Sequence, residues 1–125
     1  MTNRVEFDTA ETGLRAVLKD YHEIALRVIW ASPEGLGSRA VWDLVNAGLK
    51  GETISRASII NFLEAMREAG VLKGDEKTGK GGHRWIYSPS MNEAEFKQYI
   101  ARTILESLLR SFPEEMSEAL KRANA

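Results

Sequence analysis

Apolar residues recur at helical spacing over the first third of the chain. Between Glu11 and Ala31 they fall three and four positions apart, which places them on one face of a helix. The members of this stripe are Leu14, Val17, Leu18, Tyr21, Ile24, Ala25, Val28 and Ile29. Pro33 and Gly35 follow, and neither residue type continues a helix well. The pattern predicts one amphipathic helix that runs from Glu11 to Ala31.

Two shorter helices are predicted next. The first spans residues 39–47, and Ser38 is suited to cap it. The second spans residues 56–69, with Ser55 as its N-cap and Gly70 as its stop. The positions expected to face inward are Val41, Leu44 and Val45 in the first helix and Ile59, Phe62, Leu63 and Met66 in the second.

After Gly70 the pattern changes from helical to extended. Val71–Lys73 and Arg84–Tyr87 are typical of two short strands, and residues 74–82 between them are mainly glycine and charged residues. We therefore expect a β-hairpin with a long flexible tip. Trp30 and Trp85 are expected to fill the core between the first helix and this hairpin, whereas Trp42 is expected to be partly exposed.

The last part of the chain returns to helical spacing. Ser90 and Glu93 have the spacing of a capping box, and the helix that they open should reach about Ser111. Pro113 then suits the first turn of a final short helix. The long helix has apolar residues on more than one side, namely Phe96, Tyr99, Ile100, Ile104, Leu105, Leu108, Leu109 and Phe112. We expect these residues to form a dimer interface, the alternative being a helix that packs across its own body.

Three helices, a hairpin and two more helices give a mostly α protein with a small β-hairpin (α+β). This order is that of a winged helix-turn-helix, in which the third helix lies in the major groove of DNA. We expect a DNA-binding domain over residues 1–90 and a C-terminal helical dimerisation segment over residues 91–125.

Composition excludes several other classes of protein. The 125 residues suit one domain, and the absence of cysteine excludes disulfides, thiol catalysis and zinc ribbons. His22 and His83 are the only histidines, so we expect no metal and no other cofactor, and His22 is expected to lie on the surface. The acidic start and the shortness of every apolar run favour a cytoplasmic protein with no membrane association.

Charge is distributed unevenly along the chain. The formal net charge is −1, which is unusual for a protein that binds a polyanion. Residues 39–84 nevertheless carry eight Lys or Arg against six Asp or Glu, whereas both flanking segments are net acidic. The basic excess therefore coincides with the predicted helix-turn-helix and hairpin.

The front of the third helix offers groups that read DNA bases. Arg56, Ser58 and Asn61 provide hydrogen bonds, and Ala57 and Ile60 provide apolar contacts for thymine methyl groups. The alternative is an ordinary solvent-facing helix surface. Glu64 and Glu68 would be repelled by phosphates, so only the first two turns are expected to enter the groove.

Cations in the hairpin suit the phosphate backbone. Lys77, Lys80, His83 and Arg84 lie in or beside the glycine-rich tip, although a merely solvated loop is the alternative. The complete set of expected DNA contacts is Arg39, Ser55, Arg56, Ala57, Ser58, Ile60, Asn61, Lys77, Lys80, His83 and Arg84.

Several of these segments resemble one known family. Val28-Ile29-Trp30, the stretch from Ile54 to Leu63, Ala69-Gly70-Val71-Leu72 and the aromatic returning strand are similar to the penicillinase/methicillin-resistance repressor family, which includes copper-responsive repressors. The resemblance covers roughly residues 20–112. It implies a homodimeric repressor of a palindromic operator, with Arg56, Ser58 and Asn61 in the recognition helix and the helices after the wing at the dimer interface. Copper sensing is not carried over, because that branch uses C-terminal cysteines.

Two other classes of function compete with a DNA-binding regulator. One is a winged-helix module that binds protein and does not read DNA sequence, which the net acidity favours. The other is an enzyme, but Gly79-Lys80-Gly81-Gly82 lacks the order of a phosphate-binding loop and no nucleophile–base pair stands out. We therefore expect no catalytic activity and double-stranded DNA as the partner, and the sequence leaves open whether the chain also senses a small-molecule effector.

Overall fold

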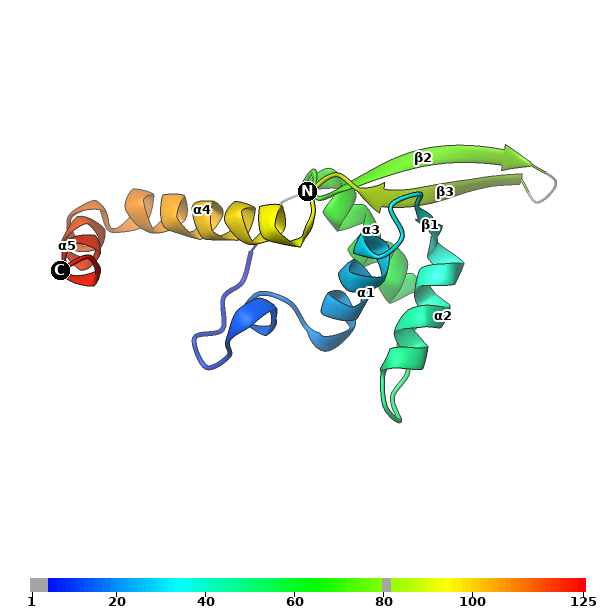
Figure 1. The fold of residues 1–125 in the computed structure, drawn as a ribbon, viewed down its shortest axis with the longest axis horizontal. Coiled ribbons are helices and arrows are strands. Elements are labelled where there is room, and N and C mark those ends of the chain that lie inside the picture. The colour runs from blue at the N-terminus through cyan, green and yellow to red at the C-terminus, as the bar shows by residue number, and fades with distance from the viewer. Residues whose placement is uncertain (1–4, 80–81) are drawn as a thin grey trace.

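The computed structural model describes residues 5–79 and 82–125, apart from the side chain of His83. This part of the chain holds five α-helices, one 3₁₀ turn and a three-stranded sheet (Figure 1). In chain order the elements are η1 (Gly13–Ala16), α1 (Asp20–Trp30), β1 (Leu36–Gly37), α2 (Ser38–Gly48), α3 (Arg56–Glu68), β2 (Leu72–Gly79), β3 (Gly82–Pro89), α4 (Glu93–Ser111) and α5 (Pro113–Ala123). The predicted winged-helix arrangement is confirmed at the level of an α+β fold.

The first predicted helix is wrong in its extent. Gly13 has a φ of +66°, and Lys19 is extended at the N-cap of α1, so the chain breaks into the turn η1 and a shorter helix. Leu14 and Leu18 remain buried even so, 6% and 8% exposed, because the broken segment folds back onto the core. The apolar stripe therefore predicted burial correctly and continuous helix incorrectly.

The second and third helices lie close to their predicted bounds. Gly37, and not Ser38, is the N-cap of α2, and Leu44 is 44% exposed although its spacing predicted an inward position. Helix α3 begins directly after Ser55, as predicted, and the Ser55 hydroxyl accepts a hydrogen bond from the backbone N–H of Ser58 at 3.1 Å. The core that these helices share with the sheet is formed by Leu14, Leu18, Ala25, Leu26, Ile29, Val41, Val45, Ile59, Phe62, Leu63, Val71, Leu72, Tyr87 and Phe96.

The hairpin differs from the prediction in two respects. Strands β2 and β3 pair without interruption from Leu72–Pro89 to Gly79–Gly82, so most of the predicted flexible tip is strand. A short third strand, β1, pairs with β3 and gives the sheet order β1-β3-β2. Gly35 makes this third strand feasible, because its φ is +101° and a Cβ there would lie 2.6 Å from Cγ2 of Ile86.

Helix α4 leaves the body as an arm, and α5 lies at its far end (Figure 1). The capping box that opens α4 is formed by Asn92 and Glu95, two residues later than the predicted pair Ser90 and Glu93. Pro113 stands in the first turn of α5, as predicted. The sheet and the arm extend from opposite ends of the molecule, with α1, α2 and α3 beside the base of the sheet (Figure 1).

Candidate nucleic-acid interface

The turn between α2 and α3 is held by two side chains of α2. Asn46 Oδ1 accepts a hydrogen bond from the backbone N–H of Ile54 at 2.9 Å, and Trp42 Nε1 donates to the Ile54 carbonyl oxygen at 2.7 Å. Both polar groups of the Ile54 backbone are thereby satisfied immediately before the N-cap of α3. Trp42 thus fixes the helix-turn-helix from a half-buried position.

The front of α3 is open to solvent. Arg56, Ala57 and Asn61 are exposed, and Ser58 and Ile60 are partly exposed. None of the chain's described terminal segments covers this end of the helix in Figure 1. Ser55 and Ser58 are partly committed to capping, because the Ser55 hydroxyl also donates to the Ser58 hydroxyl at 2.9 Å. Arg56 and Asn61, which are exposed and take no part in capping, are therefore the polar side chains best placed to reach a ligand in front of the helix.

A groove of about 520 Å³ lies where α2, α3 and β3 meet. Three arginines line it, Arg39 from α2, Arg56 from α3 and Arg84 from β3, although they are far apart in the sequence. Arg56 Nη2 donates to the Ser38 hydroxyl at 3.2 Å, which ties the start of α3 to the start of α2. Asp43 also lines the groove, so the lining carries one negative charge beside the three positive charges of the arginines.

A cluster of four side chains joins α3 to the wing. Glu64 Oε1 accepts from Arg67 Nη2 at 2.7 Å, and Glu64 Oε2 accepts from the Tyr87 hydroxyl at 2.5 Å. The Arg67 guanidinium also lies over the ring of Trp85, 5.2 Å from its centroid. Because Glu64 pairs with Arg67 and Tyr87 within the chain, its repulsion of phosphates is weaker than the sequence alone suggested.

These contacts shift the pKa values of the cluster. Hydrogen bonds from Arg67 and Tyr87 lower the pKa of Glu64, so it is a carboxylate at neutral pH. Burial, followed by the hydrogen bond to Glu64, raises the pKa of Tyr87, so its phenol keeps its proton. The cluster therefore stays in one protonation state over the physiological range and holds the wing at a fixed place beside α3.

Sequence reasoning missed Arg67 and misplaced Trp85. Trp85 is 40% exposed and lines the groove, whereas the sequence predicted that it fills the core. The partner of Arg67 on its own helix was detectable, because positions three apart on a helix face each other, as Glu64 and Arg67 do. Gly74 leaves room for the stacking of Arg67 on Trp85, because a Cβ there would lie 2.5 Å from Cδ of Arg67 and 3.2 Å from Cε3 of Trp85.

The remaining predicted contacts lie on the wing. Lys77 is exposed on β2 and pairs in register with Arg84 on β3, so the two cations are neighbours across the hairpin. Lys80 lies outside the described residues, as does the side chain of His83, whose backbone belongs to β3. The structure thus brings Arg39, Arg56, Ile60 and Arg84 together in the groove and places Lys77 further along the same hairpin.

His22 is not the surface residue that the sequence predicted. Its ring stacks on Phe62 of α3, with a centroid distance of 4.1 Å and an interplanar angle of 8°. Burial, reinforced by the nearby charge of Lys19, lowers the pKa of His22 to about 4. The imidazole is therefore neutral at physiological pH and serves as an aromatic packing partner between α1 and α3.

The rest of the described fold offers neither a metal centre nor a membrane-spanning helix. Among the described residues, no group of three His, Asp or Glu side chains is placed to hold a metal ion. Within residues 5–79 and 82–125, no helix combines the length and the apolarity needed to cross a bilayer.

Comparison with known proteins gives a likeness to a solved structure. No family model matches the chain, and no curated protein does. A solved structure named "Possible transcriptional regulator from Methanosarcina mazei Go1" superimposes with a TM-score of 0.55 at 12% sequence identity. The match covers 97% of this chain and 98% of that chain, so the arm is shared as well as the body. At this identity the likeness is one of fold.

Proposed function

We propose that the chain is a sequence-specific DNA-binding transcriptional regulator that acts as a homodimer and represses by occupying a palindromic operator. The observation that carries this proposal is the groove in which Arg39, Arg56 and Arg84 meet beside the exposed front of α3. An exposed helix end flanked by cations suits the major groove of DNA and the phosphate backbones on either side of it.

The residues divide into two roles under this proposal. Two residues read base edges: the Asn61 amide pairs with adenine, and the Arg56 guanidinium pairs with guanine. Arg39, Arg84 and Lys77 hold phosphates, because they flank α3 on α2 and on the wing. The internal pairing of Glu64 supports this division, since that carboxylate is already neutralised by Arg67.

The arm supports the homodimer. Beyond its first turns α4 has no fully buried residue, and Leu108, Phe112 and Leu120 on the arm are 36%, 56% and 37% exposed. Apolar side chains gathered on a helix that its own body does not cover indicate a partner. Phe96 is excluded from this interface, because it is 2% exposed within the chain's own core, and Tyr99 packs against the same core.

A dimer also accounts for DNA binding by a chain with a net charge of −1. Two half-sites on one duplex bind together, so the affinity of each half-site need not be high. The resemblance to the penicillinase/methicillin-resistance repressor family and the regulator-like name of the structural neighbour agree with this assignment.

Selection of bound fragments from random DNA, followed by gel-shift titration, tests the proposal. We expect an enriched inverted repeat and a loss of at least about tenfold in affinity for the Arg56→Ala, Asn61→Ala double variant, with dimerisation retained. Arg122→Ala on α5 is the matched control, because it removes one exposed cation far from the groove along the chain. No enriched sequence at low salt would refute the proposal.

A protein-binding winged helix is the second candidate. Trp85, 40% exposed in the groove, is the observation that favours it, because an exposed tryptophan is a common anchor of protein interfaces. The two candidates differ in the effect of Trp85→Ala. A DNA-binding protein should lose far less affinity for its operator from Trp85→Ala than from Arg56→Ala.

A further inference from the structure

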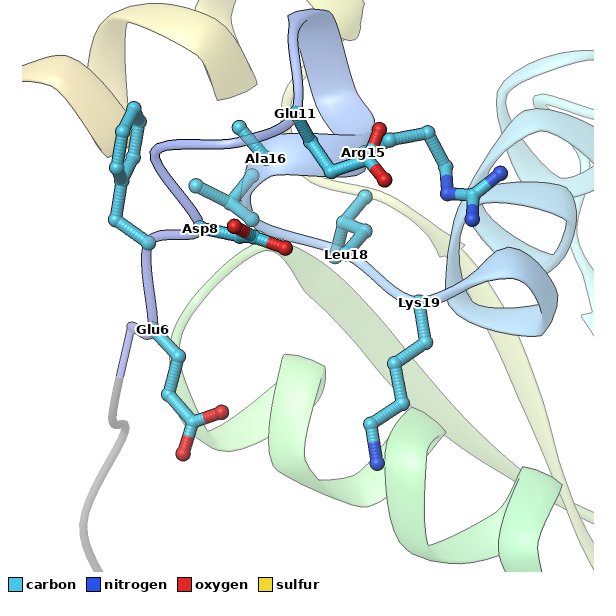
Figure 2. A pocket seen from close by; sticks show the side chains of 9 residues that line it. Glu6, Asp8, Glu11, Arg15, Ala16, Leu18 and Lys19 are labelled. Atoms are coloured by element: carbon cyan, nitrogen blue, oxygen red, sulfur yellow. The ribbon is translucent and has the colours of Figure 1, made fainter.

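An apolar groove of about 310 Å³ lies between α4 and the segment that precedes α1, residues 7–17, which we call the N-terminal segment. Phe7, Leu14 and Val17 form one side, and Lys97, Ile100 and Ile104 of α4 form the other. The N-terminal segment also borders a second hollow, in which charged side chains such as Glu6, Glu11 and Lys19 do not converge on one point (Figure 2). The apolar groove is therefore the side of the segment that favours an apolar occupant.

The face of α4 that lines this groove continues along the arm. Ile100, Ile104 and Leu108 are spaced four residues apart, which keeps them on one face of α4, and Phe112 follows at the same spacing as the C-cap of the helix. The N-terminal segment covers the beginning of this face only. Leu108 and Phe112, at its distal end, are exposed, and the Phe112 ring is the most exposed of the large apolar side chains in the described part of the chain.

We propose that a second copy of the chain packs its α4 antiparallel against this face, with Ile104 near the twofold axis and the partner's Phe112 in the apolar groove. The inference rests on the proposed homodimer and specifies its geometry. In an antiparallel pair about Ile104, residues whose numbers are equally far from 104 lie opposite each other. Ile100 then meets the partner's Leu108, and the partner's Phe112 lies one further turn along, next to Lys97 at the near end of the groove.

Side-chain size and charge favour this arrangement. Ala101 lies opposite the partner's Ser107, three residues from the twofold axis, and two small residues at this position allow the helices to approach closely. Lys97 lines the groove, and the partner's Phe112 is followed by Glu114 and Glu115 in the first turn of α5, which brings opposite charges together. A parallel pair would instead place Phe112 against its own copy and leave the groove without an occupant.

The consequence concerns more than the arm. The segment formed by Phe7, Leu14 and Val17 would clamp the distal end of the partner's α4, while Leu14 also belongs to the core that supports α1. Each protomer would thereby fix the direction of the other's arm. This contact would set the separation of the two α3 helices along DNA.

Because the chain contains no cysteine, engineered cysteines test the geometry directly. Val17→Cys with Phe112→Cys should give a disulfide-linked dimer on mild oxidation, since the two Cβ atoms need to approach to about 4 Å. Phe112→Cys alone should stay uncrosslinked, because the two copies of residue 112 lie about 24 Å apart in the antiparallel pair. Leu44→Cys with Phe112→Cys is the matched control, since Leu44 is an exposed apolar residue on α2.

A second measurement does not depend on disulfide formation. Phe112→Ala and Phe7→Ala both replace exposed side chains, so folding should be retained, and each should raise the dimer dissociation constant about tenfold in sedimentation equilibrium. Leu44→Ala should leave the dissociation constant unchanged.

The outcomes separate this inference from the proposed function. The dimer could bind its operator yet crosslink through Phe112→Cys alone and not through Val17→Cys with Phe112→Cys. That result would overturn the antiparallel docking but not the proposed DNA-binding function. The antiparallel docking is overturned in the same way if the groove takes a small apolar ligand while Phe112→Ala dimerises normally. A chain that is monomeric at all concentrations and binds no DNA overturns both.

Discussion

Protonation of His22 should destabilise the fold under mildly acidic conditions. The imidazole stacks on Phe62 and also contacts the Tyr21 ring, with a centroid distance of 4.2 Å. Burial, with a smaller contribution from Lys19, lowers its pKa from 6.5 to about 4. His22→Phe keeps an aromatic ring against Phe62 and removes the titrating group.

The size of the expected stability loss follows from the pKa of His22 in the unfolded chain, 6.5, and its pKa in the folded chain, about 4. Between pH 6.5 and pH 4 the unfolded chain binds a proton at residue 22 that the folded chain does not, so stability falls as the pH falls through this window. Above pH 6.5 residue 22 is neutral in both the folded and the unfolded chain, so the full stability of the fold is present. The full pKa difference corresponds to roughly 3 kcal/mol, and about 2 kcal/mol of it should be lost between pH 7.5 and pH 5. These figures are upper limits, because His22 is partly exposed.

Urea unfolding followed by circular dichroism at pH 7.5 and pH 5 measures this loss. Working at pH 5 avoids the low-pKa carboxylates Glu64 and Glu93, whose stabilising contributions are lost only at still lower pH. His22→Phe should lose much less stability than the unmodified chain over the same interval. An NMR titration midpoint near 6.5 for His22, or equal losses in both proteins, would refute the reasoning.

Three further substitutions test contacts around α3 and the wing. Ser55→Ala removes the N-cap and should lower the unfolding free energy by about 1 kcal/mol in urea, whereas Ser55→Asn should restore it; equal stability of all three proteins would contradict the capping role. Gly35→Ala forces a Cβ against Ile86 at a φ of +101°, which should lower the unfolding free energy by about 1–3 kcal/mol and reduce the melting temperature. An unchanged melting temperature would show that the turn does not need glycine. Tyr87→Phe removes a hydrogen bond to Glu64, so it should lower the unfolding free energy by about 1 kcal/mol and raise the pKa of Glu64. A carboxyl NMR titration would detect the shift, and an unshifted pKa would contradict the hydrogen bond between Tyr87 and Glu64.

Local signals explain why α3 could be predicted well. Its N-cap, its apolar stripe and its C-terminal glycine lie within sixteen consecutive residues, from Ser55 to Gly70, and each acts through the residues nearest to it. The exposed positions Arg56 and Asn61 follow directly from the buried ones. For the same reason the sequence indicated most of the candidate site on α3.

Nonlocal contacts explain what the sequence could not indicate. The strand pairing between Lys77 and Arg84 depends on backbone register, which glycine and charged side chains do not reveal. The break before α1 is invisible in the apolar pattern, because Leu14 and Leu18 are buried whether or not they are helical. The partnership of Glu64 with a tyrosine 23 residues later likewise requires the folded chain.

The salt dependence of DNA affinity tests the central proposal most directly, because it reports phosphate contacts made by the groove. Operator binding by the unmodified chain should weaken steeply with salt, and Arg39→Ala and Arg84→Ala should each reduce the slope of log affinity against log salt by about 1 per half-site. Asn61→Ala should leave the slope unchanged while relaxing sequence preference. If the arginine variants retained the full slope, the surface formed by α2, α3 and β3 would not be where this chain meets DNA.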